Sequence, residues 1–167
     1  MIQSTSPVLF FYMTPPFSAG LNWTYQPFSL LDAPALYAIL RLRSEVFVVE
    51  QNCVYLDTDG KDELSWHCCG RINGQLAAYA RLIPPGTSYE TASIGRVVVA
   101  PAFRGQEMGR ALMEEAIRKT FELYGGDSIT IGAQTYLIRF YQSLGFSTVG
   151  EEYPEDGIPH ITMILKK

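Results

Sequence analysis

Apolar residues recur along the chain with two different periods, and this alternation predicts a mixed fold of strands and helices. The aromatic-rich segment from Trp23 to Phe28 favours a first strand. Asp32 is a suitable N-cap, and Pro34 fits the first turn of a helix. Apolar residues then follow at mostly helical spacing, which predicts one helix that ends near Glu50.

A β-hairpin is the clearest local prediction. After a loop rich in Asp, Gly and Asn over residues 51–63, two extended runs, Leu64 to Ile72 and Gln75 to Ile83, flank Asn73-Gly74. Both central residues of a type I′ turn need positive φ, and this dipeptide supplies them at low cost. Another strand is expected from Ile94 to Val99, where β-branched residues end the run.

The second half of the chain repeats the alternation of periods. Apolar positions from Met108 to Leu123 give an amphipathic helix that Gly125-Gly126 closes. A turn, Arg104 to Gly109, precedes this helix. The remaining expected elements are a strand over Ser128 to Ile131, a helix over Gln134 to Leu144, and strands over Ser147 to Tyr153 and Ile158 to Leu165.

The length and composition predict one compact domain with a short arm. The chain has 167 residues, of which 47% are hydrophobic, enough for a core without metal or disulfide staples. Residues 1–20 contain no charged side chain, and the periodic patterns begin only near Asn22. We therefore expect residues 1–20 to form a loosely ordered arm and 21–167 to form the domain. The apolar part of the arm lacks the basic flank of a signal peptide and is too short to span a membrane, so no membrane partner is expected.

Charge and cysteine content exclude some functional classes. Thirteen Lys and Arg against 17 Asp and Glu give a net charge of −4, which argues against nucleic acid as a partner. The cysteines, Cys53, Cys68 and Cys69, number three and show no CxxC spacing, which suits a reducing cytoplasm. No metal is expected, because successive residues of the His67-Cys68-Cys69 run would face opposite sides of a strand.

The turn from Arg104 to Gly109 carries the first functional signal. A glycine-containing turn between a strand and a helix presents unpaired backbone N–H groups and a helix dipole to an anion. The simpler alternative is a turn that needs glycine only for its backbone conformation. The turn is neither a P-loop, since no Gly-Lys-Ser/Thr follows, nor the three-glycine dinucleotide fingerprint.

Three segments in order, Val97 to Pro101, Arg104 to Gly109 and Phe140 to Phe146, resemble the GNAT superfamily of acyl-CoA N-acyltransferases. Further segments, Arg43 to Gln51, Asp59 to Asp62 and Glu155 to His160, are similar to its ElaA-like branch. The resemblance covers nearly everything from Trp23 to the C-terminus. It implies an α/β (α+β) fold, in which helices flank a central mixed, mostly antiparallel sheet that is splayed where the pantetheine arm of acetyl-CoA inserts.

The resemblance also implies an activity and a set of contacts. Acetyl-CoA would be the cosubstrate, and its acetyl group would pass directly to a primary amine, on a small molecule or a peptide, in a ternary complex. A homodimer is compatible with the family. The cofactor-binding residues that the resemblance implies are Val97, Val98, Val99, Arg104, Gly105, Gln106, Glu107, Met108, Gly109, Arg110 and Gln134.

Physical chemistry gives reasons for the catalytic candidates. Tyr141 matches the superfamily tyrosine that gives a proton to the departing thiolate, and a phenol with a pKa near 10 is protonated at neutral pH. Its alternative role is that of a packed aromatic side chain. Several superfamily members carry a glutamate on the strand before the turn, but no carboxylate lies on the strand from Ile94 to Val99. The base would come from the segments that resemble the ElaA-like branch, where Glu50 and His67 are the chosen candidates beside Glu45, Asp62 and His160; a neutral substrate or an ordered water chain is the alternative. Arg96 and His160 are candidate substrate contacts, although Arg96 would equally suit an ion pair with a loop carboxylate.

Glu107 departs from the family pattern, because it occupies the middle glycine position of the turn. A carboxylate facing the pyrophosphate would repel it, whereas one in solvent would be nearly harmless. This residue therefore leaves open a second class of function, a non-catalytic binding or sensor module with weakened affinity for CoA. A third reading, acyl transfer from a carrier protein, rests on a resemblance of Arg43 to Phe47 to the homoserine-lactone synthases.

Overall fold

A computed structural model describes residues 20–167, which form one mixed sheet with helices on both faces. The predicted arm, residues 1–20, lies outside the described residues except for Gly20. Within the described range the sheet has seven strands in the order β1-β2-β3-β4-β5-β7-β6. The strands are β1 (Leu21–Pro27), β2 (Trp66–Ile72), β3 (Gln75–Ile83), β4 (Ala92–Val99), β5 (Ser128–Gln134), β6 (Ser147–Glu155) and β7 (Ile158–Lys166).

The helical segments connect these strands. Two helices are long, α1 (Ala33–Arg43) and α2 (Met108–Tyr124), and α3 (Ile138–Gln142) is short. A π-helix, η2 (Ser44–Glu50), continues α1. Short 3-10 turns are η1 (Phe28–Leu30), η3 (Pro101–Phe103) and η4 (Thr135–Leu137).

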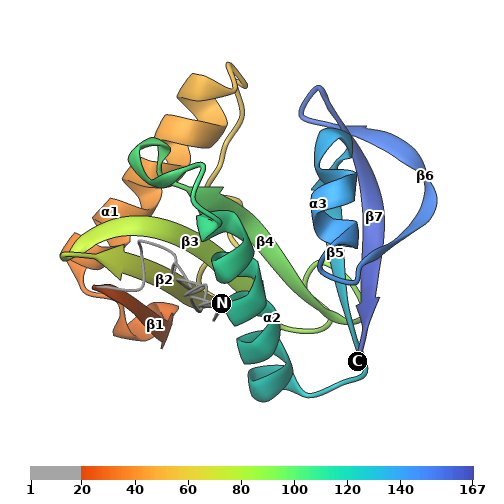
Figure 1. Cartoon of the computed structure of the whole chain (residues 1–167), viewed down its shortest axis with the longest axis horizontal. Coiled ribbons are helices and arrows are strands. Elements are labelled where there is room, and N and C mark those ends of the chain that lie inside the picture. Colours follow the sequence, from red (N-terminus) through yellow and green to blue (C-terminus); the bar gives the residue numbers. More distant parts are fainter. Residues whose placement is uncertain (1–19) are drawn as a thin grey trace, which may run out of the picture.

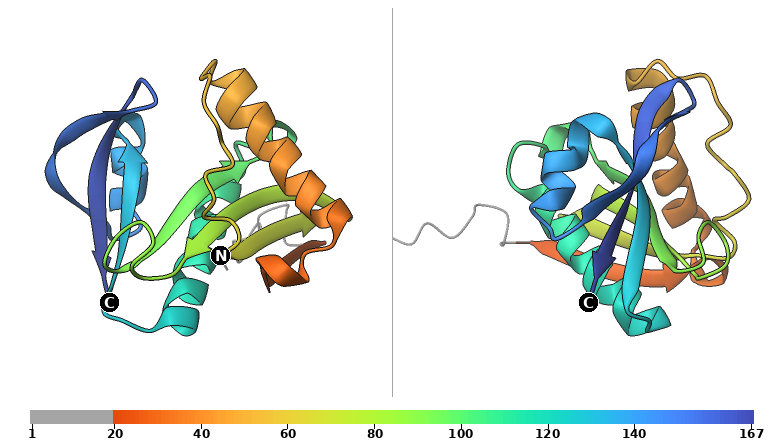
Figure 2. Two further views of the ribbon diagram at one scale, coloured as in Figure 1. Left: turned by 180° about the vertical axis from the view of Figure 1, so that it is seen from behind. Right: turned by 90° about the vertical axis from the view of Figure 1, so that its right-hand side faces the viewer.

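The helices α1 and α2 cover opposite faces of the sheet, as Figures 1 and 2 show. Side chains alternate between the faces of a strand, so the adjacent Cys68 and Cys69 of β2 enter different cores. Cys68 packs with the core beneath α2, which includes Leu112 and Met113. Cys69 packs with the core beneath α1, which includes Ile39. Both thiols are buried, and burial raises the pKa of each.

The hairpin and the start of α1 confirm the local predictions. Asn73 and Gly74 have φ angles of 49° and 80°, the two positive values that the predicted turn requires. The Asp32 carboxylate accepts a hydrogen bond of 2.7 Å from the backbone N–H of Ala35, as an N-cap should. These local signals fix the positions of β2, β3 and α1 against one another.

The sheet opens between β4 and β5, the one parallel pair among the described strands. Only Ala92 with Ile129 and Ser93 with Thr130 are paired, after which the two strands diverge (Figure 1). All other neighbouring strands are antiparallel. The predicted mixed, mostly antiparallel and splayed sheet is thereby confirmed.

Two predicted helices differ from the structure. The helix expected to end near Glu50 changes at Ser44 to a π-helix, in which the N–H of Gln51 donates to the carbonyl of Val46. The helix expected from Gln134 starts only at Ile138, because β5 runs on to Gln134 and pairs there with His160 of β7. Pairing with β7 along the whole of β5 outweighs the local helical pattern.

Candidate active site

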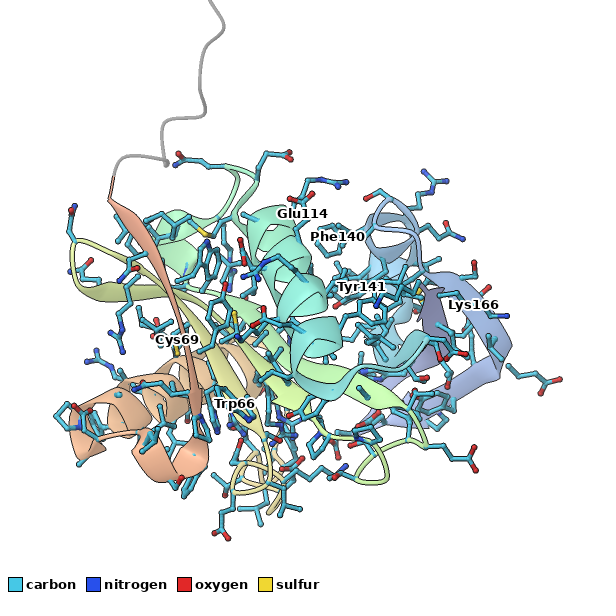
Figure 3. The ribbon with its side chains drawn as sticks, turned by 90° about the horizontal axis from the view of Figure 1, so that it is seen from below. Trp66, Cys69, Glu114, Phe140, Tyr141 and Lys166 are labelled. Atoms are coloured by element: carbon cyan, nitrogen blue, oxygen red, sulfur yellow. The ribbon has the colours of Figure 1, made fainter. Side chains whose placement is uncertain are left out.

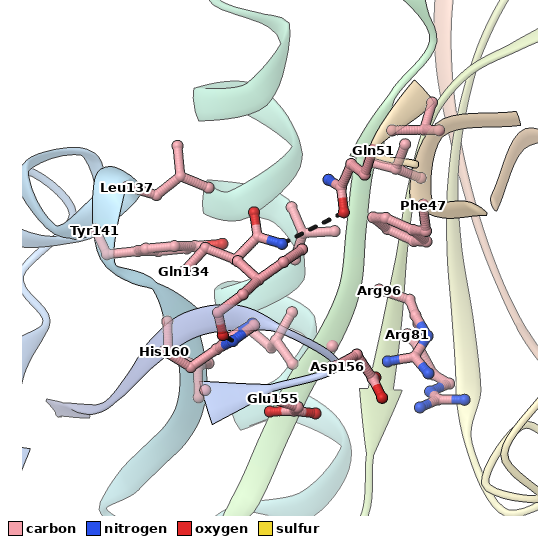
Figure 4. A pocket seen from close by; sticks show the side chains of 18 of the residues that line it. Phe47, Gln51, Arg81, Arg96, Gln134, Leu137, Tyr141, Glu155, Asp156 and His160 are labelled. Carbon is pink, nitrogen blue, oxygen red and sulfur yellow. Dashed lines mark hydrogen bonds between the residues drawn. The ribbon is translucent and has the colours of Figure 1, made fainter. Parts of the chain in front are cut away.

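A cavity of about 1110 Å³ lies where β4 and β5 diverge, and Figure 4 shows part of its lining. It brings together most of the predicted site residues: Glu50, Arg96, Val97, Val98, Val99, Arg104, Gly105, Glu107, Met108, Gly109, Gln134, Tyr141 and His160. Gln106, Arg110 and His67 are not among the residues that line it. Residues from both halves of the splayed sheet line the cavity, so the divergence of β4 and β5 forms the site.

A β-bulge shapes the wall that β4 provides. Val98 pairs with Tyr79 and Gly95 pairs with Arg81, so two residues of β4 lie opposite one residue of β3. Arg96, the first of the two, has a φ of 51°, which is uncommon for a residue with a side chain. The bulge takes the backbone of residues 96 and 97 out of the regular ladder beside the cavity. The sequence pattern did not predict it, since residues 94–99 were expected to form one regular strand.

The turn before α2 has the conformation that its glycine pattern predicts. Gly105 has a φ of 78° and Glu107, the N-cap of α2, a φ of 62°. The Glu107 side chain is 78% exposed, and its Oε2 lies 3.6 Å from Nε of Arg110. The carboxylate is therefore mostly exposed to solvent and lies beside a positive charge, although Glu107 is also one of the residues that line the cavity.

Two polar contacts link η2 and the loop after it to other walls of the cavity. The Arg104 guanidinium donates to both carboxylate oxygens of Glu50, at 2.9 and 3.0 Å. Gln134 of β5 donates to the side-chain oxygen of Gln51 at 3.5 Å, a long hydrogen bond drawn as a dashed line in Figure 4. Because the π-helix ends at Glu50, it presents both Glu50 and Gln51 to the cavity. Gln51 was not predicted as a site residue.

Tyr141 lies on α3 beside α2, and its ring is directed into the cavity (Figures 3 and 4). The ring packs edge-on against Phe140 and Phe146, with centroids 5.1 and 5.9 Å away. Burial, followed by the neighbouring Tyr136, raises the pKa of Tyr141 to about 12. The hydroxyl therefore keeps its proton at neutral pH, as a general acid must.

Arg96 is held by loop carboxylates. Its Nε donates to Oδ1 of Asp57 at 2.7 Å, and its guanidinium lies 5.6 Å from the centre of the Tyr55 ring. The ion pair with a loop carboxylate, one of the two predicted roles, is therefore present. Asp57 also accepts a hydrogen bond of 2.8 Å from Arg43, which is fully buried.

The ion pairs continue to Arg81 and Asp59, which also line the cavity, and to the buried Asp62. Arg43 donates to Asp62 at 2.6 Å, and Arg81 donates to the same Asp62 oxygen at 2.9 Å and to Asp59 at 2.7 Å. Burial alone would raise the pKa of Asp59, but the hydrogen bond and charge of Arg81 outweigh it and hold the pKa below its usual value. Three arginines and three aspartates thus attach the loop after η2 to α1, β3 and β4. The sequence did not predict this network, because its members are dispersed along the chain.

The two histidines occupy different environments. His67 is 1% exposed; its Nδ1 lies 2.8 Å from the Tyr79 hydroxyl and its Nε2 lies 3.1 Å from the carbonyl of Asp62. Burial lowers its pKa. His160 lines the cavity, stacks on Tyr153 and contacts the carbonyl of Ile158 through Nδ1 at 2.8 Å. Of the two, only His160 lies where a substrate can reach it.

No helix within residues 20–167 is long and apolar enough to cross a membrane. The same residues contain no group of three or more His, Cys, Asp or Glu side chains that could hold a metal ion.

Comparison with known proteins identifies the family. Residues 58–167 match the model of the acetyltransferase (GNAT) domain, so the chain belongs to the GNAT acetyltransferases and is classed as an acyltransferase. The chain is similar to protein ElaA of Escherichia coli, with 43% identity over 145 residues that cover 86% of this chain and 95% of ElaA. The predicted superfamily and its ElaA-like branch are thereby confirmed.

Solved structures agree with the sequence comparison. The crystal structure of E. coli ElaA has a TM-score of 0.82 at 42% identity and covers 87% of this chain and 99% of its own. An acyl-CoA N-acyltransferase from Pseudomonas aeruginosa has a TM-score of 0.83 at 42% identity, with the same coverage. The Salmonella typhimurium protein yncA, solved with acetyl-CoA, shares the fold with a TM-score of 0.65 at 20% identity and covers 87% of this chain and 94% of its own.

Proposed function

We propose that this protein transfers the acetyl group of acetyl-CoA to a primary amine by direct attack in a ternary complex. The observation that carries the proposal is one cavity that joins three features: the diverging strands β4 and β5, the turn before α2, and the protonated hydroxyl of Tyr141. Each serves a different part of the reaction. Transfer from a thioester needs a place for the cosubstrate, an anchor for its phosphates and a proton for the departing sulfur.

The chain offers a suitable place for each part of acetyl-CoA. Backbone groups of β4 that have no partner on β5 are free to bond the amides of the pantetheine arm. The backbone N–H groups at the start of α2 and the positive end of its dipole favour the pyrophosphate. Arg104 lines the cavity at the same turn and adds a positive charge. Holding the thioester in this way lowers the entropic part of the barrier.

In the transfer step, the lone pair of the amine nitrogen forms a bond to the thioester carbonyl carbon, and the C–S bond then breaks. The sulfur takes up the proton of the Tyr141 hydroxyl, and the amine nitrogen passes one proton to water, from which the Tyr141 phenolate regains its own. The products are the N-acetyl amine and the free thiol of CoA. A phenol whose pKa is raised to about 12 is protonated at the start of each cycle and is restored by taking up a proton afterwards.

A non-catalytic binding module was the competing interpretation, and it rested on Glu107. The Glu107 carboxylate is mostly exposed and lies beside Arg110, whose positive charge and the solvent both argue against strong repulsion of the cosubstrate. Three free cysteines, all buried, suit a reducing compartment, and we place the reaction in the cytoplasm on that ground.

The experiment that tests the proposal is acetyl-CoA-dependent thiol release in the presence of a panel of amines. The panel contains alkyl monoamines, diamines, lysine derivatives and short peptides with free N-termini. We expect saturable thiol release that requires both acetyl-CoA and an amine, together with an N-acetyl product detected by mass spectrometry. Calorimetric binding of acetyl-CoA without transfer to any member of the panel would overturn the proposal in favour of a binding module.

A further inference from the structure

Gly132 of β5 leaves an opening in the wall of the cavity. Its two neighbours on the strand, Ile131 and Ala133, are buried in the core beneath α2, so Gly132 faces the opposite side, toward the cavity. A Cβ atom placed on Gly132 would lie 2.8 Å from Oη of Tyr153 and 3.1 Å from Oη of Tyr89. It would also lie 3.8 Å from Oε2 of Glu155. Three oxygen atoms therefore converge on one point that a side chain would otherwise fill.

The three oxygens come from segments that are far apart in the sequence. Tyr89 belongs to the loop before β4, whereas Tyr153 and Glu155 lie at the end of β6. All three residues line the cavity together with Gly132. Figure 4 shows Glu155 beside His160, which stacks on the ring of Tyr153.

The charge at this point is negative and uncompensated. Among residues 20–167, no Lys, Arg or His side chain forms an ion pair with Glu155. Burial, followed by the neighbouring Tyr153 side chain and the Glu155 carboxylate, raises the pKa of Tyr89, so this phenol is uncharged at neutral pH. One carboxylate and two phenol oxygens supply three acceptors, which matches the three N–H donors of an alkylammonium ion.

The point beside Gly132 on which the three oxygen atoms converge lies at the same distance along the diverging strands as the bulge of β4. The last pair between the two strands joins Ser93 to Thr130, and two residues further along each strand lie Gly95 and Gly132. Gly95 immediately precedes the bulge at Arg96. A group bound above Gly132 therefore faces, across the diverging strands, the stretch of β4 backbone that leaves the regular ladder.

From this geometry we propose that Tyr89, Tyr153 and Glu155 bind the reacting amino group of the acceptor as its ammonium ion, and that Glu155 accepts its proton. An N–H bond of the ammonium breaks, an O–H bond forms on Oε2 of Glu155, and the nitrogen keeps the electron pair with which it attacks the thioester. The substrate class is thus cationic alkyl amines. This inference rests on the proposed acetyl transfer and names the residues that meet the acceptor.

The test compares two nucleophiles at saturating acetyl-CoA and pH 7. One is 1-butylamine, which is protonated at this pH, and the other is O-methylhydroxylamine, which is not. We expect Glu155→Gln to lower kcat/KM for 1-butylamine by about 100-fold or more, the usual size of a general-base contribution. Transfer to O-methylhydroxylamine should change by less than about 3-fold, because that nitrogen needs no prior deprotonation.

Glu152→Gln is the matched control, since Glu152 is exposed on the same strand and is not among the residues that line the cavity. It removes the same charge and should alter neither rate. A second variant, Gly132→Ala, places a methyl group at the point of convergence. We expect it to raise KM for 1-butylamine by about 10-fold or more, because the methyl group would occupy the small polar site. Calorimetric binding of acetyl-CoA should stay unchanged.

Equal losses for both nucleophiles in Glu155→Gln would overturn the assignment, and so would an unchanged KM in Gly132→Ala. Transfer by the wild-type protein to O-methylhydroxylamine but to no alkyl amine would overturn it as well. Absence of transfer to either nucleophile by the wild-type protein would instead remove the proposed acetyltransferase activity, and this inference with it. The two failures are therefore distinguishable.

Discussion

The Glu50 carboxylate and the Arg104 guanidinium form a two-pronged ion pair, with N–O distances of 2.9 and 3.0 Å. The residues come from segments that are far apart in the sequence, Glu50 from the end of η2 and Arg104 from the turn before α2. Glu50 was predicted as a candidate base and Arg104 as a cofactor contact, and in the protein without ligand each neutralises the other. Binding of a polyanionic cosubstrate therefore competes with this ion pair.

We expect Glu50→Gln to bind acetyl-CoA about 2- to 5-fold more tightly, because an exposed ion pair contributes about 0.2 to 1 kcal/mol and its loss frees Arg104 for the phosphates. Isothermal calorimetry at low and high ionic strength measures the effect, and the gain should shrink as salt screens the charges. Glu45→Gln is the control, since Glu45 is exposed on the same helical segment and does not line the cavity. Unchanged or weaker binding in Glu50→Gln would show that Arg104 does not contact the phosphates.

Glu107→Gly should stabilise the fold by about 0.5 to 1 kcal/mol. Relief of a left-handed backbone conformation is worth about 1 to 2 kcal/mol, and the added freedom of glycine in the unfolded chain offsets about half of it. Glu107 has a φ of 62°, so glycine adopts its conformation without strain. Urea denaturation measures the change, and Glu107→Ala, which keeps a Cβ, should show no gain.

The same variant tests whether Glu107 opposes the cosubstrate. Because its side chain is 78% exposed, we expect calorimetric affinities for acetyl-CoA that differ by less than about 3-fold between the wild-type protein and Glu107→Gly. An increase of a hundredfold in the glycine variant would place the carboxylate against the phosphates and revive the weakened-site interpretation.

The sequence predicted the turns and the ends of helices correctly where one or two residues determine the local backbone conformation. Asn73-Gly74 fixed the hairpin, Asp32 the start of α1 and Gly125 the end of α2. The resemblance to the GNAT superfamily supplied the splayed sheet, and most of the site residues that it implied do line the cavity. The lengths of elements were less predictable, since pairing with β7 extends β5 to Gln134 at the expense of the expected helix.

The partners in contacts between distant segments could not be identified from the sequence. The pair of Glu50 with Arg104 joins residues that no local pattern relates, and the ion pair expected for Arg96 did not specify Asp57 as the loop carboxylate. The convergence above Gly132 depends on the absence of a side chain, which no periodicity marks. Such features follow from the tertiary arrangement of loops, and only coordinates reveal them.

Tyr141→Phe should lower kcat by about 100-fold while leaving the affinity for acetyl-CoA unchanged, because it removes the proton donor and keeps the packed ring. The ring contacts with Phe140 and Phe146 do not involve the hydroxyl, so the fold should be preserved. Steady-state kinetics with the best amine of the panel measures the effect. In the wild-type protein the rate should not fall with rising pH until the pH approaches the raised pKa of about 12. Full activity of this variant would contradict the role of Tyr141 as proton donor and would make it a packed aromatic residue of the core.

His67→Gln should flatten the pH dependence of stability below about pH 6.5. Burial lowers the pKa of His67 in the folded protein, whereas in the unfolded chain it returns to about 6.5. The unfolded state therefore binds the proton first, and the stability that neutral His67 contributes is fully present above about pH 6.5 and is lost as the pH falls toward the folded-state pKa. The slope from one such group is at most about 1.4 kcal/mol per pH unit.

Denaturation series at several pH values measure this slope, and His160→Gln provides the comparison because it removes the other histidine of the chain. The His67 variant should be less stable at pH 7, since it loses the contacts with Tyr79 and Asp62, yet its unfolding free energy should vary less with pH. Retention of the wild-type slope would contradict this prediction, because it would show that the burial of His67 does not contribute to the pH dependence of stability. A flat profile would also show that His67 stays neutral through structural burial, and would leave the search for the general base to the residues that line the cavity.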